Sequence, residues 1–322
     1  MVSDYKFVEQ EDHEQGFAAI FDSDIAPLLQ ELEEKRIKAV RKSQIWVALI
    51  MTVSAGLAFQ ASTKIDPLLG IFPIAFGGAG ALIVYFERTS KLRSALTDYI
   101  RPLMCDLLKL AYQPEPSSEF MSLSRLVRLG IVPQTNRNSL GPAIEGSWRE
   151  ISYKLMRATF SQRERDSDGD QKFTVHFSGI VIEIECLVEM PTIVFYRDLG
   201  ALMNRLFSWA ARNTLPPRKL HFPDPEVEEV FEVHTSDLDK AKRLLHPEFG
   251  RLLLDLAQEH QGSSRHVSAA FAGERFYIGL NTPSGFMDFD AMDRPLSECS
   301  DKNHEAFKDL TIPRRIIDRL LD

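Results

Sequence analysis

The chain has 322 residues, of which 26% are charged, and its formal net charge is -8. Because nucleic-acid-binding proteins usually carry a basic face, this acidic balance disfavours nucleic acid as a partner. The three cysteines, Cys105, Cys186 and Cys299, are far apart and form no CxxC pair, which argues against a disulfide framework or a zinc knuckle.

Two uncharged apolar runs interrupt this charge-rich sequence, at residues 43–63 and 67–86. They contain 21 and 20 residues and no Asp, Glu, Lys or Arg. A helix rises about 1.5 Å per residue, so each run can cross a hydrocarbon core of roughly 30 Å. Since only residues 64–66 separate them, we predict two transmembrane helices joined by a short external loop. The alternative is a helical hairpin buried in a soluble core.

Basic residues flank the two runs on the side away from the connector. They are Lys35, Arg36, Lys38, Arg41 and Lys42 before the first run, and Arg88, Lys91 and Arg93 after the second. Positive residues near span ends tend to stay in the cytoplasm. We therefore expect both termini in the cytoplasm. No signal peptide is expected, because residues 1–30 are acidic and lack an apolar core.

Small residues recur at four-residue spacing in both apolar runs. They are Ala48, Thr52 and Gly56 in the first run, and Ala75, Gly77, Ala79 and Ala81 in the second. In lipid, small residues let helices approach closely. We interpret these positions as the packing surface between the two spans, with a homo-oligomeric contact as the alternative. Neither run contains an ionisable residue, so the usual mark of ion or proton transport is missing.

The predicted spans continue as helices on the cytoplasmic side. In the N-terminal segment, residues 1–42, a frayed or loosely docked start is followed by an amphipathic helix from Asp24, with Ser23 as its N-cap. After the second span, leucines at helical spacing predict a stalk helix over residues 87–112. We expect these two helices to pair as a coiled-coil-like stalk, and a groove that binds a partner is the alternative.

A Pro- and Ser-rich linker at Gln113–Ser118 precedes the predicted soluble domain, residues 119–290. Period-two patterns predict strands, and 3.6-residue patterns predict helices. The strands are at 151–160, 173–185, 192–196, 219–222, 230–233, 267–271 and 275–280, the last two joined as a hairpin at Ala272–Glu274. The helices are at 119–128, 199–211, 236–245 and 247–259, with Ser236 as an N-cap. A C-terminal helical tail, residues 291–322, is expected to be interrupted at Pro313. Because regular β-α-β alternation is missing, we predict an antiparallel α+β domain.

The sequence assigns no catalytic, cofactor-binding or metal-binding residue, and no cofactor is expected. Asp166–Asp170 offers oxygen ligands at the spacing of a calcium loop, but the twelfth position is Phe177 instead of a glutamate. We interpret the segment as a solvated hairpin tip. The histidines lack zinc spacing, so His234 and His246 are interpreted as turn or cap residues. Motifs for nucleotide phosphates and for a nucleophilic serine are missing.

Aromatic residues are dense in the second half of the chain. They are Phe222, Phe231, Phe249, Phe271, Phe276, Tyr277, Phe286 and Phe289. We interpret them as a hydrophobic core, and an exposed patch for a partner is the alternative.

Several positions in this half resemble a known family. They are Phe177 and Gly179 in a Phe-x-Gly step, then Phe231, Val233, Ala241, Leu245, Phe271 and Gly273. With two spans ahead of them, they resemble the bacterial domain-of-unknown-function family 3137. The resemblance implies a bacterial inner-membrane protein with a cytosolic domain and no assigned activity. No catalytic residues can be carried over from it.

We therefore expect a membrane-anchored, non-enzymatic interaction module. Its expected partners are the lipid bilayer and a protein or other membrane-proximal component. Two alternatives stay open at this point: an enzyme acting on a membrane-proximal substrate, and an oligomeric channel or transporter subunit.

Overall fold

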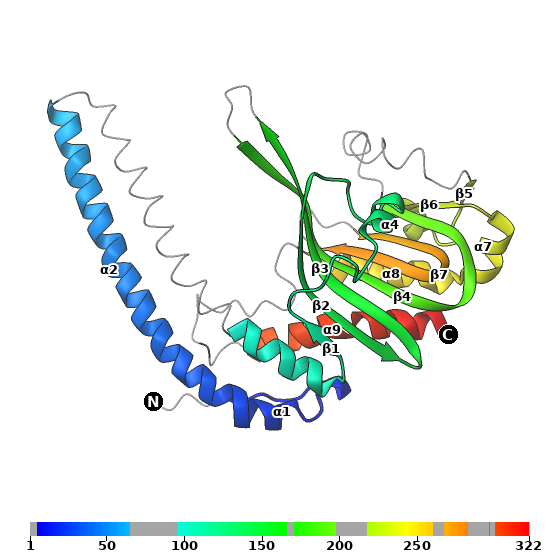
Figure 1. The fold of residues 1–322 in the computed structure, drawn as a ribbon, viewed down its shortest axis with the longest axis horizontal. Helices are drawn as coiled ribbons and strands as arrows, with labels where there is room; N and C mark the ends of the chain where they lie inside the picture. The colour runs from blue at the N-terminus through cyan, green and yellow to red at the C-terminus, as the bar shows by residue number, and fades with distance from the viewer. Residues whose placement is uncertain are drawn as a thin grey trace. The chain divides into compact units, whose positions relative to one another are not determined.

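A computed structural model describes residues 5–64, 96–165, 171–197, 218–259, 267–282, 296 and 300–321 (Figure 1). The chain divides into two compact units. The first unit contains Met1–Leu107 and Met287–Phe307, and the second contains Leu108–Phe286 and Lys308–Asp322. The second predicted span, the acidic hairpin tip and the predicted helix 199–211 lie outside the described residues.

The described part of the first unit is mostly helical. It opens with η1 (Asp12–Glu14), α1 (Phe17–Ile20) and η2 (Phe21–Ile25), which lead directly into α2 (Ala26–Lys64). At 39 residues, α2 is about 58 Å long. As predicted, the charged helix and the first apolar run form one unbroken helix. Residues 96–107 are also helical.

Three predictions for this unit were wrong. From residue 5 on, the N-terminal segment is neither frayed nor loosely docked, because Phe7, Phe17 and Phe21 are buried. Ser23 is not an N-cap, since it lies inside η2, where its Oγ donates to the carbonyl of Ile20 at 3.4 Å. The helix after the second predicted span ends at residue 107, before Lys109 adopts a φ of 57°.

The second unit is built on a seven-stranded antiparallel sheet, which confirms the α+β class. The strands are β1 (Ala111–Gln113), β2 (Arg137–Trp148), β3 (Ile151–Arg165), β4 (Gln171–Arg197), β5 (Arg218–Leu220), β6 (Phe231–Thr235) and β7 (Val267–Asn281). Their order is β1-β2-β3-β4-β6-β5, and β7 pairs with β4. At 27 residues, β4 merges two predicted strands and forms the centre of the sheet.

The predicted hairpin at Ala272–Glu274 was wrong, because β7 is one continuous strand. It pairs antiparallel with β4 from Asn281 opposite Gly179 to Ala269 opposite Phe195. Gly273, with a φ of 65°, marks an irregularity in this ladder instead of a turn. Isolated glycines in strands often mark such bulges.

Among the described residues, the helices that follow β1 along the chain are α4 (Leu123–Arg128), α6 (Pro225–Val230), α7 (Leu238–Leu244), α8 (Pro247–Glu259) and α9 (Ser300–Leu321). The bounds of α8 match the prediction. Asp237 caps α7 by accepting from the backbone N–H groups of Asp239 and Lys240, so the predicted cap at Ser236 was wrong. Helix α9 continues through Pro313, and the division between the two units falls within it.

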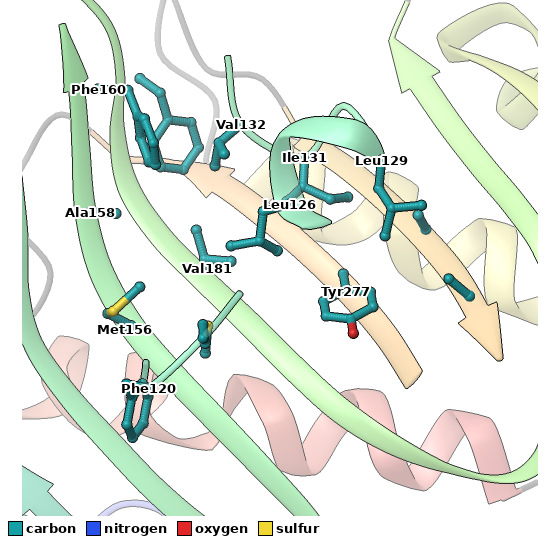
Figure 2. Close-up of a cluster of buried hydrophobic side chains, with 14 of the residues drawn as sticks. Phe120, Leu126, Leu129, Ile131, Val132, Met156, Ala158, Phe160, Val181 and Tyr277 are labelled. Atoms are coloured by element: carbon teal, nitrogen blue, oxygen red, sulfur yellow. The ribbon is translucent and has the colours of Figure 1, made fainter. Parts of the chain in front are cut away.

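Two hydrophobic clusters cover opposite faces of the sheet, since neighbours along a strand point to opposite faces. Figure 2 shows the first, in which Leu126, Leu129 and Ile131 of the α4 segment lie over Val181 and Tyr277. The second is aromatic and contains Phe195, Phe222, Phe231, Phe249, Phe271 and Phe276, all buried. The core interpretation is therefore confirmed for these phenylalanines and Tyr277, while Phe286 and Phe289 lie outside the described residues.

Candidate functional site

The apolar half of α2 is the most unusual surface of the described chain. Seven large apolar side chains on it are between 40% and 72% exposed: Ile45, Trp46, Leu49, Met51, Val53, Leu57 and Phe59. Only 12% of its most apolar 18-residue window is buried. A core helix of a soluble protein would bury most of such a window. By length and composition, this is the one helix among the described residues that could cross a membrane.

The charged half of α2 carries a ladder of ion pairs on its own surface. Glu31 pairs with Lys35 at 2.5 Å, and Glu34 pairs with Lys38 at 3.7 Å. The hydrogen bond from Arg36 lowers the pKa of Glu33, whose Oε2 also accepts from the backbone N–H of Leu296. Lys35, Arg36 and Lys38 are therefore each paired locally, and Glu33 is tied to the C-terminal segment.

An aromatic and ionic cluster precedes α2 in the first unit. Phe7 stacks on His304 with ring centroids 4.5 Å apart, and Phe17 meets Phe307 edge to face at 4.8 Å. Glu14, which is fully buried, has its Oε1 2.6 Å from Nδ1 of His304. The cluster packs the N-terminal segment against the first turns of α9.

The protonation of Glu14 follows from its surroundings. Burial alone would raise the pKa of this carboxyl. Hydrogen bonds from His304 and from the backbone N–H groups of Gln10 and Glu11 outweigh burial, so the pKa of Glu14 is lowered. Because a carboxylate only accepts hydrogen bonds, Nδ1 of His304 is the donor. The pair is thus engaged in holding the fold.

The predicted small-residue stripe on α2 is exposed in the described structure. Ala48, Thr52 and Gly56 are all exposed, and Thr52 Oγ1 donates to the carbonyl of Ala48 at 2.7 Å. Among the residues of this half whose burial is described, the buried small ones are instead Ser54 and Ala58. Ala75, Gly77, Ala79 and Ala81 lie outside the described residues, so packing between the two spans stays a prediction.

The family-like positions are distributed over the second unit as packing positions. Seven of them are buried: Phe177 and Gly179 of β4, Phe231 and Val233 of β6, Ala241 of α7, Leu245 just after α7, and Phe271 of β7. Phe177 packs edge to face on Phe160 at a centroid distance of 6.0 Å. These positions are spread over β4, β6, α7 and β7, and they do not surround a common polar side chain.

Gly179 shows why the Phe-x-Gly step has its form. A Cβ at this position would lie 1.9 Å from the carbonyl oxygen of Leu280 and 2.7 Å from the backbone N of Thr282. The backbone of the neighbouring strand β7 therefore passes so close to this position that only glycine fits. The preceding residue, Ser178, donates its backbone N–H to Asn281 Oδ1 at 2.9 Å, which fixes the end of β7.

The polar residues singled out from the sequence have ordinary local roles where they are described. His246 Nδ1 accepts from the backbone N–H of Glu248 at the start of α8, as expected of a cap residue. His234 lies within β6 with Nε2 3.2 Å from Glu232 Oε1, so it is not a turn residue. In the described ranges, no group of three or more His, Cys, Asp or Glu side chains could hold a metal ion.

With the sheet and its packing positions established, the chain can be compared with known proteins. Residues 175–321 match the model of a family described as a protein of unknown function, DUF3137. This part of the chain belongs to the DUF3137 family. The DUF3137 segment runs from β4 into α9 and includes all eight family-like positions, which confirms the resemblance. Helix α2 precedes it.

Other comparisons add little to the DUF3137 match. No curated protein sequence matches the chain. The crystal structure of the mycobacterial trehalose monomycolate transport factor A, TtfA, aligns with 67% of this chain and 89% of that chain, at 12% sequence identity and a TM-score of 0.30. A TM-score of this size establishes no shared fold.

Proposed function

We propose that this DUF3137 protein is a membrane-anchored interaction module whose sheet-containing unit binds a protein partner at the bacterial inner membrane. In this proposal α2 supplies the first span and residues 67–86 supply the second. Both termini, and with them the sheet unit, are then cytoplasmic. The observation that carries the proposal is the exposed apolar half of α2.

The size of that apolar surface supports a membrane environment. Covering one large apolar side chain stabilises a protein by about 1.5–3 kcal/mol relative to exposing it to water. For the exposed set on α2, the total is on the order of 10 kcal/mol, comparable to the stability of a whole domain. The charged half of the helix carries Glu–Lys and Glu–Arg pairs that suit water. The change in character at residue 43 matches a helix entering lipid.

The interaction role is supported by what the family-like residues do. They fill the core or permit close strand contacts, as Phe177 and Gly179 illustrate. Residues that define a family through packing preserve a scaffold, and functional specificity then lies on its surface. A scaffold held at the membrane presents that surface to membrane-proximal proteins.

Crosslinking in native membranes tests this role. A lysine-reactive crosslinker has exposed targets on the sheet unit, such as Lys172, Lys219 and Lys242, and others on α2, such as Lys35 and Lys38. The proposal predicts a reproducible partner whose peptides are linked to lysines of the sheet unit. A variant lacking residues 119–290 but keeping both predicted spans should lose this partner. Recovery of only self-links from the intact chain contradicts the proposal.

A further inference from the structure

We infer that Arg41 and Lys42 form a binding surface for the headgroups of acidic phospholipids at the level where α2 enters the membrane. The inference rests on the proposed function, because it requires α2 to be the anchor. It adds a lipid class to that anchor.

The basic residues upstream on α2 are already compensated. Lys35 pairs with Glu31, and Lys38 pairs with Glu34. Arg36 makes two hydrogen bonds of 2.7 Å to Glu33, and both side chains of that pair are less than 20% exposed. These three cations therefore have little charge left to offer to a ligand.

Arg41 and Lys42 differ because no acidic residue can reach them from their own helix. The last carboxylate on α2 is Glu34, and none follows before the helix ends at Lys64. Ion pairs on a helix surface require a spacing of three or four residues. The positions at that spacing from Arg41 and Lys42 carry no Asp or Glu. Both residues are exposed.

Their height on the helix coincides with the expected membrane surface. Ile45 is four residues above Arg41, and Trp46 is four residues above Lys42, a rise of about 6 Å in each case. Ile45 is 61% exposed and Trp46 is 44% exposed. Tryptophan concentrates at the boundary between headgroups and hydrocarbon. Long basic side chains one turn below it can reach the phosphates while their stems lie along apolar surface.

The chemistry of the two side chains suits lipid phosphates that carry net negative charge. Arginine can hold two phosphate oxygens in a bidentate fork, and lysine adds a compact point charge. Near an anionic membrane surface each such residue increases the affinity about fivefold. Zwitterionic lipids offer the same phosphate with a compensating cation, so acidic lipids are the favoured occupant.

Quenching of Trp46 fluorescence by brominated lipids tests the inference with the full chain. The protein is reconstituted in vesicles of equal parts phosphatidylcholine and phosphatidylglycerol. In one set only the phosphatidylglycerol acyl chains are brominated, and in the other only the phosphatidylcholine chains. Bromine quenches nearby tryptophan, so the ratio of the two signals reports which lipid is enriched around Trp46. The Trp46→Phe variant identifies the part of the signal that comes from this residue.

The expected ratio favours brominated phosphatidylglycerol by about threefold to tenfold. The double substitution Arg41→Gln/Lys42→Gln should bring the ratio close to one, while total quenching persists. The matched control is Lys242→Gln/Arg243→Gln, which removes an equal charge from two adjacent exposed residues of α7 and should leave the ratio unchanged.

The outcomes separate the lipid preference from the anchor. Strong but equal quenching by both lipids overturns the inference and leaves the anchor in place. A preference that survives Arg41→Gln/Lys42→Gln also overturns it, because other residues must then select the lipid. If neither brominated lipid quenches Trp46, the proposed anchor itself is overturned.

Discussion

Oε1 of Glu14 lies 2.6 Å from Nδ1 of His304, although the two residues are 290 positions apart in the sequence. Only 1% of the Glu14 side chain is exposed, and its Oε2 also accepts from the backbone N–H of Gln10 at 2.7 Å. The N-terminal segment, which directly precedes the proposed anchor helix α2, is therefore fixed to the start of α9.

We predict that Glu14→Gln destabilises the protein at neutral pH. The pKa of Glu14 is lowered in the folded protein, so the ionised carboxylate contributes stability above its unfolded pKa of about 4.3. That contribution is lost as the pH falls through the lower, folded pKa. We expect a loss of about 1–3 kcal/mol near pH 7 that shrinks below about pH 4.

Urea unfolding of the detergent-solubilised chain at a series of pH values measures this loss. Glu31→Gln removes an exposed carboxylate paired with Lys35 and serves as the control, with little expected change. An equal loss for Glu14→Gln at neutral and acid pH would show that the contact does not depend on ionisation.

Gly179→Ala is expected to be among the most damaging single substitutions. Its new methyl group would meet the Leu280 carbonyl oxygen at 1.9 Å, a backbone atom that cannot rotate away. We predict a loss of about 3 kcal/mol or more. At Gly273 the added methyl group meets nothing within 4 Å, but the φ of 65° strains alanine, so Gly273→Ala should cost about 1 kcal/mol. Thermal unfolding of both variants checks this order, and similar costs would contradict the close strand contact.

Neighbouring arginines of α9 provide a second matched comparison. Arg314 lies over Trp148 with its guanidinium 4.8 Å from the ring centroid, and it donates to the carbonyl of Leu108 at 3.1 Å. Arg315 forms an exposed ion pair with Glu259. We predict a cost of about 2 kcal/mol for Arg314→Gln and less than about 1 kcal/mol for Arg315→Gln. Chemical denaturation gives both values, and a larger loss at Arg315 would reverse the assignment.

Local patterns predicted many of the regular elements and failed where distant contacts decide. The bounds of α8 and the continuity of α2 followed from helical periodicity and run length. The packing of the N-terminal segment could not be predicted, because Phe7 contacts His304 and Phe17 contacts Phe307, both from the far end of the chain. Their burial depends on tertiary contacts that no local window contains.

The sheet shows the same limit. By its local sequence Gly273 predicts a turn. Because β7 pairs with β4 on both sides of it, Gly273 is instead a bulge within one strand. Strand β2 went unpredicted because Gly141 and Pro142 interrupt it at a register shift, where such residues are tolerated. For the candidate anchor, run length and charge predicted the first helix. The residues of its proposed partner span lie outside the described residues.

The number of spans can be tested by the accessibility of two engineered cysteines. Lys38 and Tyr99 lie on either side of the proposed hairpin, and their side chains are 79% and 42% exposed. With two spans, Lys38→Cys and Tyr99→Cys should react with an impermeant maleimide from the cytoplasmic side only. With a single span, the two cysteines would react from opposite sides.

Background labelling should be low in a Cys299→Ser chain. Burial raises the pKa of the Cys105 thiol to about 12, and burial likewise raises the pKa of the Cys186 thiol to about 12. Maleimides react with the thiolate, which both residues therefore populate weakly at neutral pH.

Alkaline carbonate extraction of cell membranes tests the anchor most directly. We predict that the intact chain stays in the membrane pellet and that Leu49→Arg/Val53→Arg is released. Each arginine costs about 2.5–3.5 kcal/mol near the centre of a spanning helix. Leu187→Arg changes a 75% exposed leucine of β4 in the sheet unit and should stay in the pellet with the intact chain. Complete release of the intact chain by carbonate would contradict the account, because α2 would then not be held in the bilayer.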